Sequence, residues 1–526
     1  MEERKWLPHL YRSVPKEAHG YLLSAYSIAL EGWRRGMTLK FTNDKGMLLR
    51  NFTLSYKGKS HQFSASRSDI VPKNAVRICI DKYLTKEYLM ESGVPTPIGK
   101  IFTNKSSDEE VIIYANDLGY PLVLKPSNAS GGQGVIANIK NIKEFREALQ
   151  HVRHTLKFDD VIVEEFVKGE DYRVYVIDGK VVGIIGRKTA HVIGDGKSRI
   201  RRLLDKKVKE RGENPAIQNS PIVIDKELHD MLALSDYTLD SIPGKGEEIP
   251  LKSISNVSVG GDPVDATDIL PNEIKEIAIN AARAIPGLVQ AGVDVMYNSV
   301  DNTGYVLEIN SKPSIRTHLF PIEGKARDIP KAIIDYCFPE SVSSEGTTAS
   351  YYFGIQGIYK AFLHGEAKEF VVPDMPYGNI SSFEWIISGS SRINTKKWVL
   401  GRVRRLGLHG YVSQLKSGET SVVISGKINA IKEFEEMVKK EVARKSLRME
   451  VKEYTHPVKI GFEFKEFKKR EKRKKTRPTQ KEYNKLLLER DFYRKRFKNI
   501  ENSKTWRITR PIRKLSYFAK NIFKSN

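Results

Sequence analysis

Two short runs of the chain are mostly apolar, as buried β-strands are. Residues 291–297 and 304–310 are joined by the turn-rich segment Asn298-Ser-Val-Asp-Asn-Thr-Gly304, which predicts a β-hairpin. With the turn centred on Asp301, Asp294 lies opposite Glu308, and the strand period of two points Asn310 the same way as Glu308. These hard oxygen ligands suit Mg²⁺. The alternative is a solvent-facing pair of strands, because short patterns of this kind recur by chance.

The periodicity of hydrophobic residues divides the rest of the chain into segments. An amphipathic helix around residues 22–33 and strands around 37–42 and 52–63 predict an N-terminal α/β segment over residues 1–75. From 76 to 340 helices (81–91 and 142–155) alternate with strands (121–125, 161–166, 172–177 and 180–185), which predicts an α/β or α+β enzyme core. A polar linker at 341–350, a compact segment at 351–460 and a tail at 461–526 complete the prediction.

Charge and composition narrow the class of protein. The 526 residues are 40% hydrophobic and 29% charged, with a net charge of +24. Residues 465–526 hold 23 Lys and Arg against 6 Asp and Glu, which leaves +7 for the rest, and no recognised nucleic-acid module accompanies them. Neither cysteine, Cys79 or Cys337, belongs to a metal or redox pattern. Without a long apolar run or a secretion signal, we expect a cytoplasmic protein that binds no specific nucleic acid.

A lysine-bearing strand that runs into a glycine-rich loop predicts phosphate binding. Lys125 is followed by Ser130, Gly131, Gly132, Gln133 and Gly134. Glycines allow backbone N–H groups to surround an anion, and a lysine in an apolar strand requires a charged partner. A P-loop is excluded at Gly194-Asp-Gly-Lys-Ser198, because His191 stands where that pattern needs glycine.

A broken strand over residues 161–175 predicts a site for a base and a ribose. Backbone groups near Glu165 and Val167 can pair with an adenine edge, and Asp171 can accept from ribose hydroxyls; the alternative is a surface hairpin rich in acids. Glu164 is a further candidate nucleotide-binding residue of this segment. Arg173 and Arg187 lie on neighbouring strands, where they can neutralise a transferring phosphoryl group.

The order of these motifs resembles the ATP-grasp superfamily of carboxylate-amine ligases, and in particular the ATP-grasp units of cyanophycin synthetases and fused glutathione synthetases. The resemblance also includes Asp81-Lys-Tyr-Leu-Thr-Lys-Glu-Tyr-Leu89, residues 187–196 and residues 256–268. It implies that Lys82 and Lys125 contact phosphates, that residues 131–134 cover them, and that Asp294, Glu308 and Asn310 hold two Mg²⁺ ions, with Mn²⁺ as a substitute. It implies amide formation through an acyl phosphate with release of ADP. Arg187 and Asn256 would stabilise the acyl phosphate, and Arg316, with His318, would lie near the acceptor.

The resemblance leaves both substrates unnamed, beyond a small-molecule carboxylate and an amine. No segment resembles the Mur-ligase-like or cysteine-ligase domains of those families, so a two-reaction enzyme is not expected. Residues 381–455 resemble acylphosphatase, a ferredoxin-like α+β sandwich, with Lys396 or Lys397 and Gln414 in place of its arginine and asparagine. We therefore expect a degenerate binding domain.

The basic tail is predicted to be helical and resembles the ends of surface-polysaccharide proteins. It could associate peripherally with the inner face of the membrane. A role in surface polysaccharide or peptide modification is consistent with this resemblance, and we expect a homo-oligomer. Two alternatives remain: a non-catalytic scaffold that binds polyanions or membranes, and an acyl-phosphate hydrolase that uses the appended domain.

Overall fold

The structure is a computed structural model of the 526-residue chain. It describes residues 6–43, 48–127, 133–252, 255–257, 260–342, 351–376, 378–388, 396–415, 417–444 and 447–465, without the side chains of 396–398. Ser130, Gly131 and Gly132 of the predicted loop, the side chains of Lys396 and Lys397, and the predicted tail beyond residue 465 lie outside this range. None of the described helices combines the length and hydrophobicity needed to span a membrane.

The central sheet carries the predicted hairpin. Its strand order is β13-β10-β9-β14-β15, and neighbouring strands are antiparallel. The strands are β9 (Glu170–Ile177), β10 (Lys180–Lys188), β13 (Asp262–Asp265), β14 (Gln290–Asn298) and β15 (Thr303–Asn310). Helices α3 (Lys73–Ile80), α4 (Lys82–Glu91) and α9 (Asn272–Ala284) share one hydrophobic core with this sheet. Val174 on β9 and Val293 on β14 point into that core, so Arg173 and Asp294 point to the opposite face.

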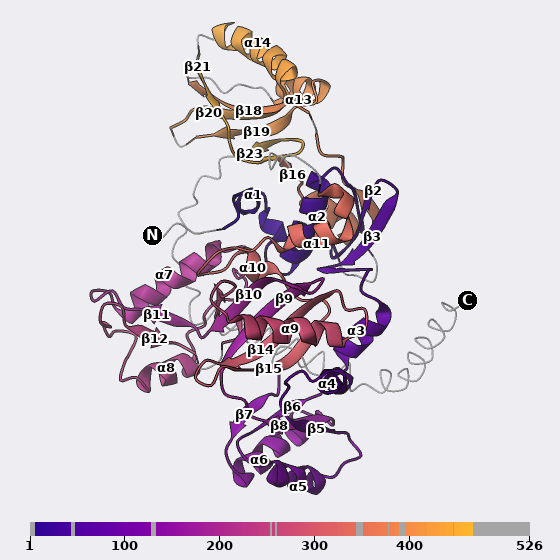
Figure 1. The fold of residues 1–526 in the computed structure, drawn as a ribbon. Coiled ribbons are helices and arrows are strands. Elements are labelled where there is room, and N and C mark those ends of the chain that lie inside the picture. Colours follow the sequence, from indigo (N-terminus) through magenta and orange to yellow (C-terminus); the bar gives the residue numbers. More distant parts are fainter. Residues whose placement is uncertain are drawn as a thin grey trace, which may run out of the picture. The chain divides into compact units, whose positions relative to one another are not determined.

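A second sheet holds the lysine strand. Its order is β5-β8-β6-β7, formed by β5 (Gly99–Phe102), β6 (Leu122–Pro126), β7 (Ile136–Ile139) and β8 (Val161–Glu165). Helices α5 (Asp108–Leu118) and α6 (Ile142–Leu149), with the π-helical turn η3 (Gln150–Thr155), share its core (Figure 1). Since Val161 and Val163 point into this core, Ile162 and Glu164 line the other face. The predicted strands and helices of this region are confirmed to within a few residues.

The N-terminal residues build a third sheet around one buried helix. Helix α2 (Leu23–Arg34) lies where the sequence predicts a helix, but it is buried on all sides, Glu31 and Arg34 included, and not only along its apolar stripe as an amphipathic helix would be. The sheet order is β17-β1-β2-β3-β4, from β1 (Thr38–Thr42), β2 (Asn51–Tyr56), β3 (Lys59–Ser64), β4 (Arg67–Ser68) and β17 (Glu369–Val371). Short elements α1 (Pro8–Tyr11), η1 (Lys16–Ala18) and η2 (Gly20–Leu22) precede them. The predicted division at 341–350 stays a prediction, but β17 joins the sheet of the N-terminal segment.

A small lobe is inserted between β10 and β13. It contains β11 (His191–Ile193), α7 (Ile200–Glu213), α8 (Lys226–Ala233) and β12 (Glu248–Pro250), around its own core. Strands β11 and β12 pair with each other and with no other described strand. The chain then continues through α10 (Arg316–Leu319), α11 (Ile329–Cys337) and η5 (Pro339–Ser341) to β16 (Tyr351–Tyr352) and α12 (Gln356–Leu363).

Residues 380–465 form a fourth sheet with two helices. The elements follow in the order β18 (Ile380–Ser388), α13 (Lys396–Arg405), β19 (His409–Gln414), β20 (Thr420–Lys427), α14 (Ile428–Arg444) and β21 (Arg448–Glu453), followed by β22 (Val458–Lys459) and β23 (Phe462–Lys465). The sheet order is β21-β18-β20-β19-β23. Both helices share a core with this sheet, around Trp385 and Phe434. The predicted sequence of strands and helices from about residue 381 matches this order.

Candidate active site

The predicted hairpin is present, and Asp294 lies opposite Glu308 as expected. The turn closes one residue earlier than predicted, because Asn298 pairs with Thr303. A β-bulge immediately after Asp294 compensates for this shift and restores the 294–308 pairing. Glu308 is exposed and Asp294 is buried, while Asn310 is intermediate and its amide nitrogen is buried without a hydrogen-bond partner among the described residues. Two carboxylates and an amide therefore share the face opposite α9.

Two arginines neutralise the buried carboxylates of this face. Arg173 lies beside Asp294 in the β9–β14 pair and donates to both carboxylate oxygens at 2.6 Å. Arg187 donates to Asp171 at 2.6 Å and to the two oxygens of Asp294 at 3.3 and 3.4 Å. Burial favours the protonated acid, but the charges of Arg173 and Arg187 outweigh it and lower the pKa of Asp294. Burial dominates at Asp171 and raises its pKa. The sequence did not predict these pairs.

A cavity of about 280 Å³ lies beside the lysine strand. Its walls come from α4, β5, β6, β8 and β15, and three predicted residues line it: Lys82, Lys125 and Glu164. Lys125 forms an ion pair with Glu164, which is the partner that its position in an apolar strand required. Leu307, the residue before Glu308, also lines the cavity, so the cavity and the hairpin face adjoin.

The cavity contains a third lysine that sequence reasoning missed. Lys86 lies one helical turn after Lys82 on α4, and its ammonium is 3.5 Å from Glu164. Burial lowers the pKa of both Lys82 and Lys86, which the charge of Glu164 partly opposes. The i, i+4 spacing of the two lysines on a predicted helix was the available signal. Gly99 lies against Glu164, since a Cβ at Gly99 would be 2.5 Å from the Glu164 Cβ.

The connector between β8 and β9 has part of its hydrogen-bonding capacity in use. The Glu165 backbone N–H donates to the Ile98 carbonyl at 2.9 Å, and the Glu165 carboxylate accepts from the Ile98 N–H at 2.9 Å. That N–H of Glu165 is thus not available to a base, while Val167 lies beyond the end of β8. Gln133 and Gly134 form a turn before β7, and Gly134 has a φ of +72° that favours glycine.

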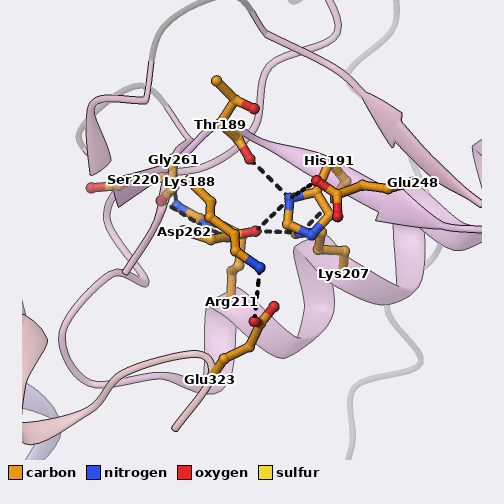
Figure 2. Close-up of polar contacts among 10 residues, drawn as sticks. All are labelled: Lys188, Thr189, His191, Lys207, Arg211, Ser220, Glu248, Gly261, Asp262 and Glu323. Carbon is orange, nitrogen blue, oxygen red and sulfur yellow. Dashed lines mark hydrogen bonds and ion pairs between the residues drawn. The ribbon is translucent and has the colours of Figure 1, made fainter. Parts of the chain in front are cut away.

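The segment that carries Asn256 is anchored by a buried ion cluster in the inserted lobe. Asp262 is fully buried; Arg211 donates to it at 2.6 Å and to the Gly261 carbonyl at 3.2 Å, and Lys207 forms a second ion pair with it (Figure 2). Lys207 also donates to the His191 carbonyl at 2.5 Å. The Gly261 N–H donates to the Asn256 carbonyl at 3.0 Å, which holds these two residues together; the segment between Lys252 and Asp262 is called the Asn256 loop below.

This cluster touches the central sheet next to a predicted catalytic residue. In the β10–β13 pair, Lys188 lies opposite Asp262 and Arg187 lies opposite Pro263. At the other end of the loop, Lys252 donates to both oxygens of Asp225 at 2.6 and 2.7 Å. Helices α7 and α8 therefore hold the two ends of the Asn256 loop, beside the strand of Arg187.

Comparison with known proteins identifies the core. Residues 79–202 match the ATP-grasp domain family. Over this segment the chain is similar to ATP-grasp domains. It is 31% identical over 327 residues to cyanophycin synthetase of Trichormus variabilis, and 30% over 285 residues to the glutathione biosynthesis bifunctional protein GshAB of Desulfotalea psychrophila. These alignments cover 61% and 53% of this chain but only 35% and 36% of the relatives. A solved bifunctional glutathione synthetase from Pasteurella multocida is 25% identical, with a TM-score of 0.46 over 55% of this chain and 41% of that one.

The ATP-grasp domain match contains Lys82, Lys125, Glu164 and both site arginines, whereas Arg316 and His318 follow the hairpin. Arg316 stacks on Tyr21 of the N-terminal segment, with its guanidinium 5.0 Å from the ring centroid. His318 is fully buried, and neither ring nitrogen has a hydrogen-bond partner among the described residues. Burial and the nearby charge of Arg173 lower the pKa of His318 to about 3, so the ring is neutral at physiological pH.

Proposed function

We propose that this chain is an ATP- and Mg²⁺-dependent carboxylate-amine ligase that forms an amide bond through an acyl phosphate and releases ADP. One observation carries the proposal: the lysine-lined cavity adjoins the carboxylate and arginine face at Leu307 and Glu308. A nucleotide in the cavity would have Lys82 and Lys125 at its phosphates, and its terminal phosphate would reach the face with Arg173 and Arg187.

The residues of the hairpin fit a magnesium ion in their chemistry. Asp294, Glu308 and Asn310 offer hard oxygens on one face, which is the donor set that Mg²⁺ prefers. Among the described residues, no group of three or more acidic, His or Cys side chains is arranged to hold a metal ion, so substrate oxygens would have to complete the coordination. Glu308 and Asn310, with Asp294, would hold the ion, which supplies neutralisation of phosphate charge.

The protein's contribution is orientation and charge neutralisation. Lys125 and Lys82 would bind phosphate oxygens, and Arg187, held by Asp171 at 2.6 Å, would face the transferring group. The Asn256 loop, which two helices anchor, would hold the acyl phosphate while an amine attacks it. The buried ion pairs keep these groups in place before substrate arrives, which lowers the entropic cost of the reaction.

The appended segment supports a second, finer proposal. The order β21-β18-β20-β19, with α13 and α14 in one core with the sheet, is the arrangement of a ferredoxin-like sandwich. We infer that residues 380–465 form such a domain and serve in binding, since lysine or glutamine stands where acylphosphatase needs arginine and asparagine.

We propose that the ligase acts on a small amino acid, a peptide or an aminosugar-containing surface precursor.

A screen of carboxylate and amine pairs for ADP release, with mass analysis of the product, tests the ligase. Lys125→Met and Glu308→Gln should each reduce product-coupled ADP release by about 100-fold or more, because the first removes a positive charge aimed at the phosphates and the second removes a carboxylate ligand of the proposed magnesium ion. Glu276→Gln is the matched control, since Glu276 is an exposed acid on α9, on the other side of the sheet. ADP release that no pair of substrates stimulates would favour a binding scaffold instead.

A further inference from the structure

Four cationic side chains gather beside the end of the proposed metal strand: Arg50, Arg67, Lys312 and Arg316. Ser311 and Lys312 directly follow Asn310, the last residue of β15. Arg67, on β4 of the N-terminal sheet, donates to the Ser311 hydroxyl at 3.3 Å. The N-terminal segment, to which the sequence assigned no chemistry, therefore reaches the immediate neighbourhood of the candidate active site.

Short hydrogen bonds hold this arrangement together. Ser66, which lies between β3 and β4, donates from its hydroxyl to the Pro313 carbonyl at 2.6 Å. This bond fixes the end of the β3–β4 hairpin against the segment that carries Lys312. The Ala65 N–H donates to the Arg50 carbonyl at 2.7 Å, so Arg50 and Arg67 lie at the same end of the β3–β4 hairpin.

The Tyr21 ring contacts both Arg50 and the fourth cation, Arg316. Tyr21 is 67% exposed, and the guanidiniums of Arg316 and Arg50 lie 5.0 and 5.9 Å from its ring centroid. A solvent-accessible aromatic ring with arginines over it positions their planar groups without neutralising them. Neither guanidinium donates a hydrogen bond to another described residue, so their N–H groups can serve a bound anion.

The cluster lacks negative charge within the described part of the chain. None of its four members forms an ion pair there with a carboxylate, in contrast to Arg173 and Arg187. Burial lowers the pKa of Arg67 and Arg316. Cations that lie close together without a carboxylate partner gain from a bound anion.

We propose that Arg50, Arg67, Lys312 and Arg316, with Tyr21, bind an anionic group of the substrate other than the carboxylate that ATP activates. The substrate class is thus a molecule with at least one further carboxylate or phosphate. This inference rests on the proposed function and names the substrate of the same site. ATP is a poor candidate for the anion, because the cavity that would take it is lined by Lys82 and Lys125 and by none of these four residues in the described structure.

Calorimetry on the full chain saturated with MgADP tests the site with two probes, triglutamate and inorganic phosphate. At least one should bind to the unmodified protein, with an affinity that falls as salt rises. Arg50→Gln/Arg67→Gln and the exposed Lys312→Gln should weaken binding, by about tenfold or more for the double variant. Lys206→Gln/Lys209→Gln, which removes two exposed charges from α7, is the matched control and should bind as before. The preferred probe distinguishes a carboxylate from a phosphate.

Failure of both probes to bind, or equal weakening in the control, overturns the anion site. The affinity for ADP should be the same in all variants, which separates this site from the nucleotide cavity. If anion binding behaves as expected but no substrate pair stimulates ADP release, the ligase proposal fails and the anion site stands. The opposite pattern would leave the ligase without this substrate class.

Discussion

Asp262→Asn should loosen the inserted lobe and the Asn256 loop together. The carboxylate is fully buried and neutralises Arg211, which is 2% exposed, and Lys207. Asparagine keeps the shape but removes the charge, so two cations remain with one neutral partner. Removal of one member of a buried ion pair typically costs about 3–5 kcal/mol. Because the Lys207 side chain is 16% exposed and partly screened by water, we expect about 3 kcal/mol.

Hydrogen exchange followed by mass spectrometry measures this effect locally. A cost of about 3 kcal/mol corresponds to a rise of about 100-fold in local opening, seen as faster exchange across residues 190–262. If the lobe positions the Asn256 loop, kcat for amide formation should fall while the affinity for ADP stays constant.

Asp240→Asn provides the control within the same lobe. Its ion pair with Arg199 is 3.3 Å long, but both side chains are more than 60% exposed. Exposed pairs contribute about 0–1 kcal/mol, so exchange should hardly change. If both variants exchange alike, or if Asp262→Asn stays within a few-fold of the parent protein, the buried cluster does not anchor the loop and this reasoning is refuted.

Three further predictions concern the site itself. Gly99→Ala should weaken ADP binding about tenfold, because a Cβ there would lie 2.4 Å from the Val163 carbonyl oxygen. Gly212→Ala is the control, since a Cβ at Gly212 meets open space, and equal ADP affinities of the two variants would contradict the close approach of β5 to β8. His318 has a folded pKa of about 3, below its usual 6.5, so the unfolded state takes up the proton first. The free energy of unfolding should therefore fall by about 1.4 kcal/mol per pH unit as pH drops from 6.5 towards 3. Thermal melts should show a flatter dependence of stability on pH for His318→Gln, and an unchanged dependence would place the ring in water. Glu308→Gln should raise the Mg²⁺ concentration needed for half-maximal ADP binding by about tenfold, and an unchanged requirement would exclude Glu308 as a ligand.

Local patterns predicted the elements of the core well, because their periodicities are short. The helix at 81–91, the lysine strand and the hairpin are all present. The pairing of Asp294 with Glu308 was predicted correctly from a symmetric turn, but the molecule reaches it through an earlier turn and a bulge that no pattern indicated. The earlier turn shifts the strand register by one residue, and the bulge shifts it back before Asp294 and Glu308.

Contacts between distant segments could not be predicted in the same way. Arg173 and Asp294 are 121 positions apart, and their ion pair depends on the register of β9 against β14. Strand β17 joins the N-terminal sheet more than 300 residues after β1 because of tertiary packing alone. The inserted lobe has short strands and a buried ion cluster, so its stabilising charges look like ordinary solvent-facing residues in the sequence.

The ion pairs of the central sheet couple metal and nucleotide binding in the proposed ligase. Arg173 and Arg187 are predicted phosphate ligands, yet each is already paired with a carboxylate, Asp294 or Asp171. A phosphate gains fully from these guanidiniums only if another cation takes over the carboxylates they leave. Asp294 is itself a proposed magnesium ligand, so an ion bound at Asp294 and Glu308 would free Arg173 for the phosphate. The same aspartate thereby keeps the arginine in position and ties its release to the arrival of the metal, which is why the Mg²⁺ requirement of Glu308→Gln is the sensitive measurement.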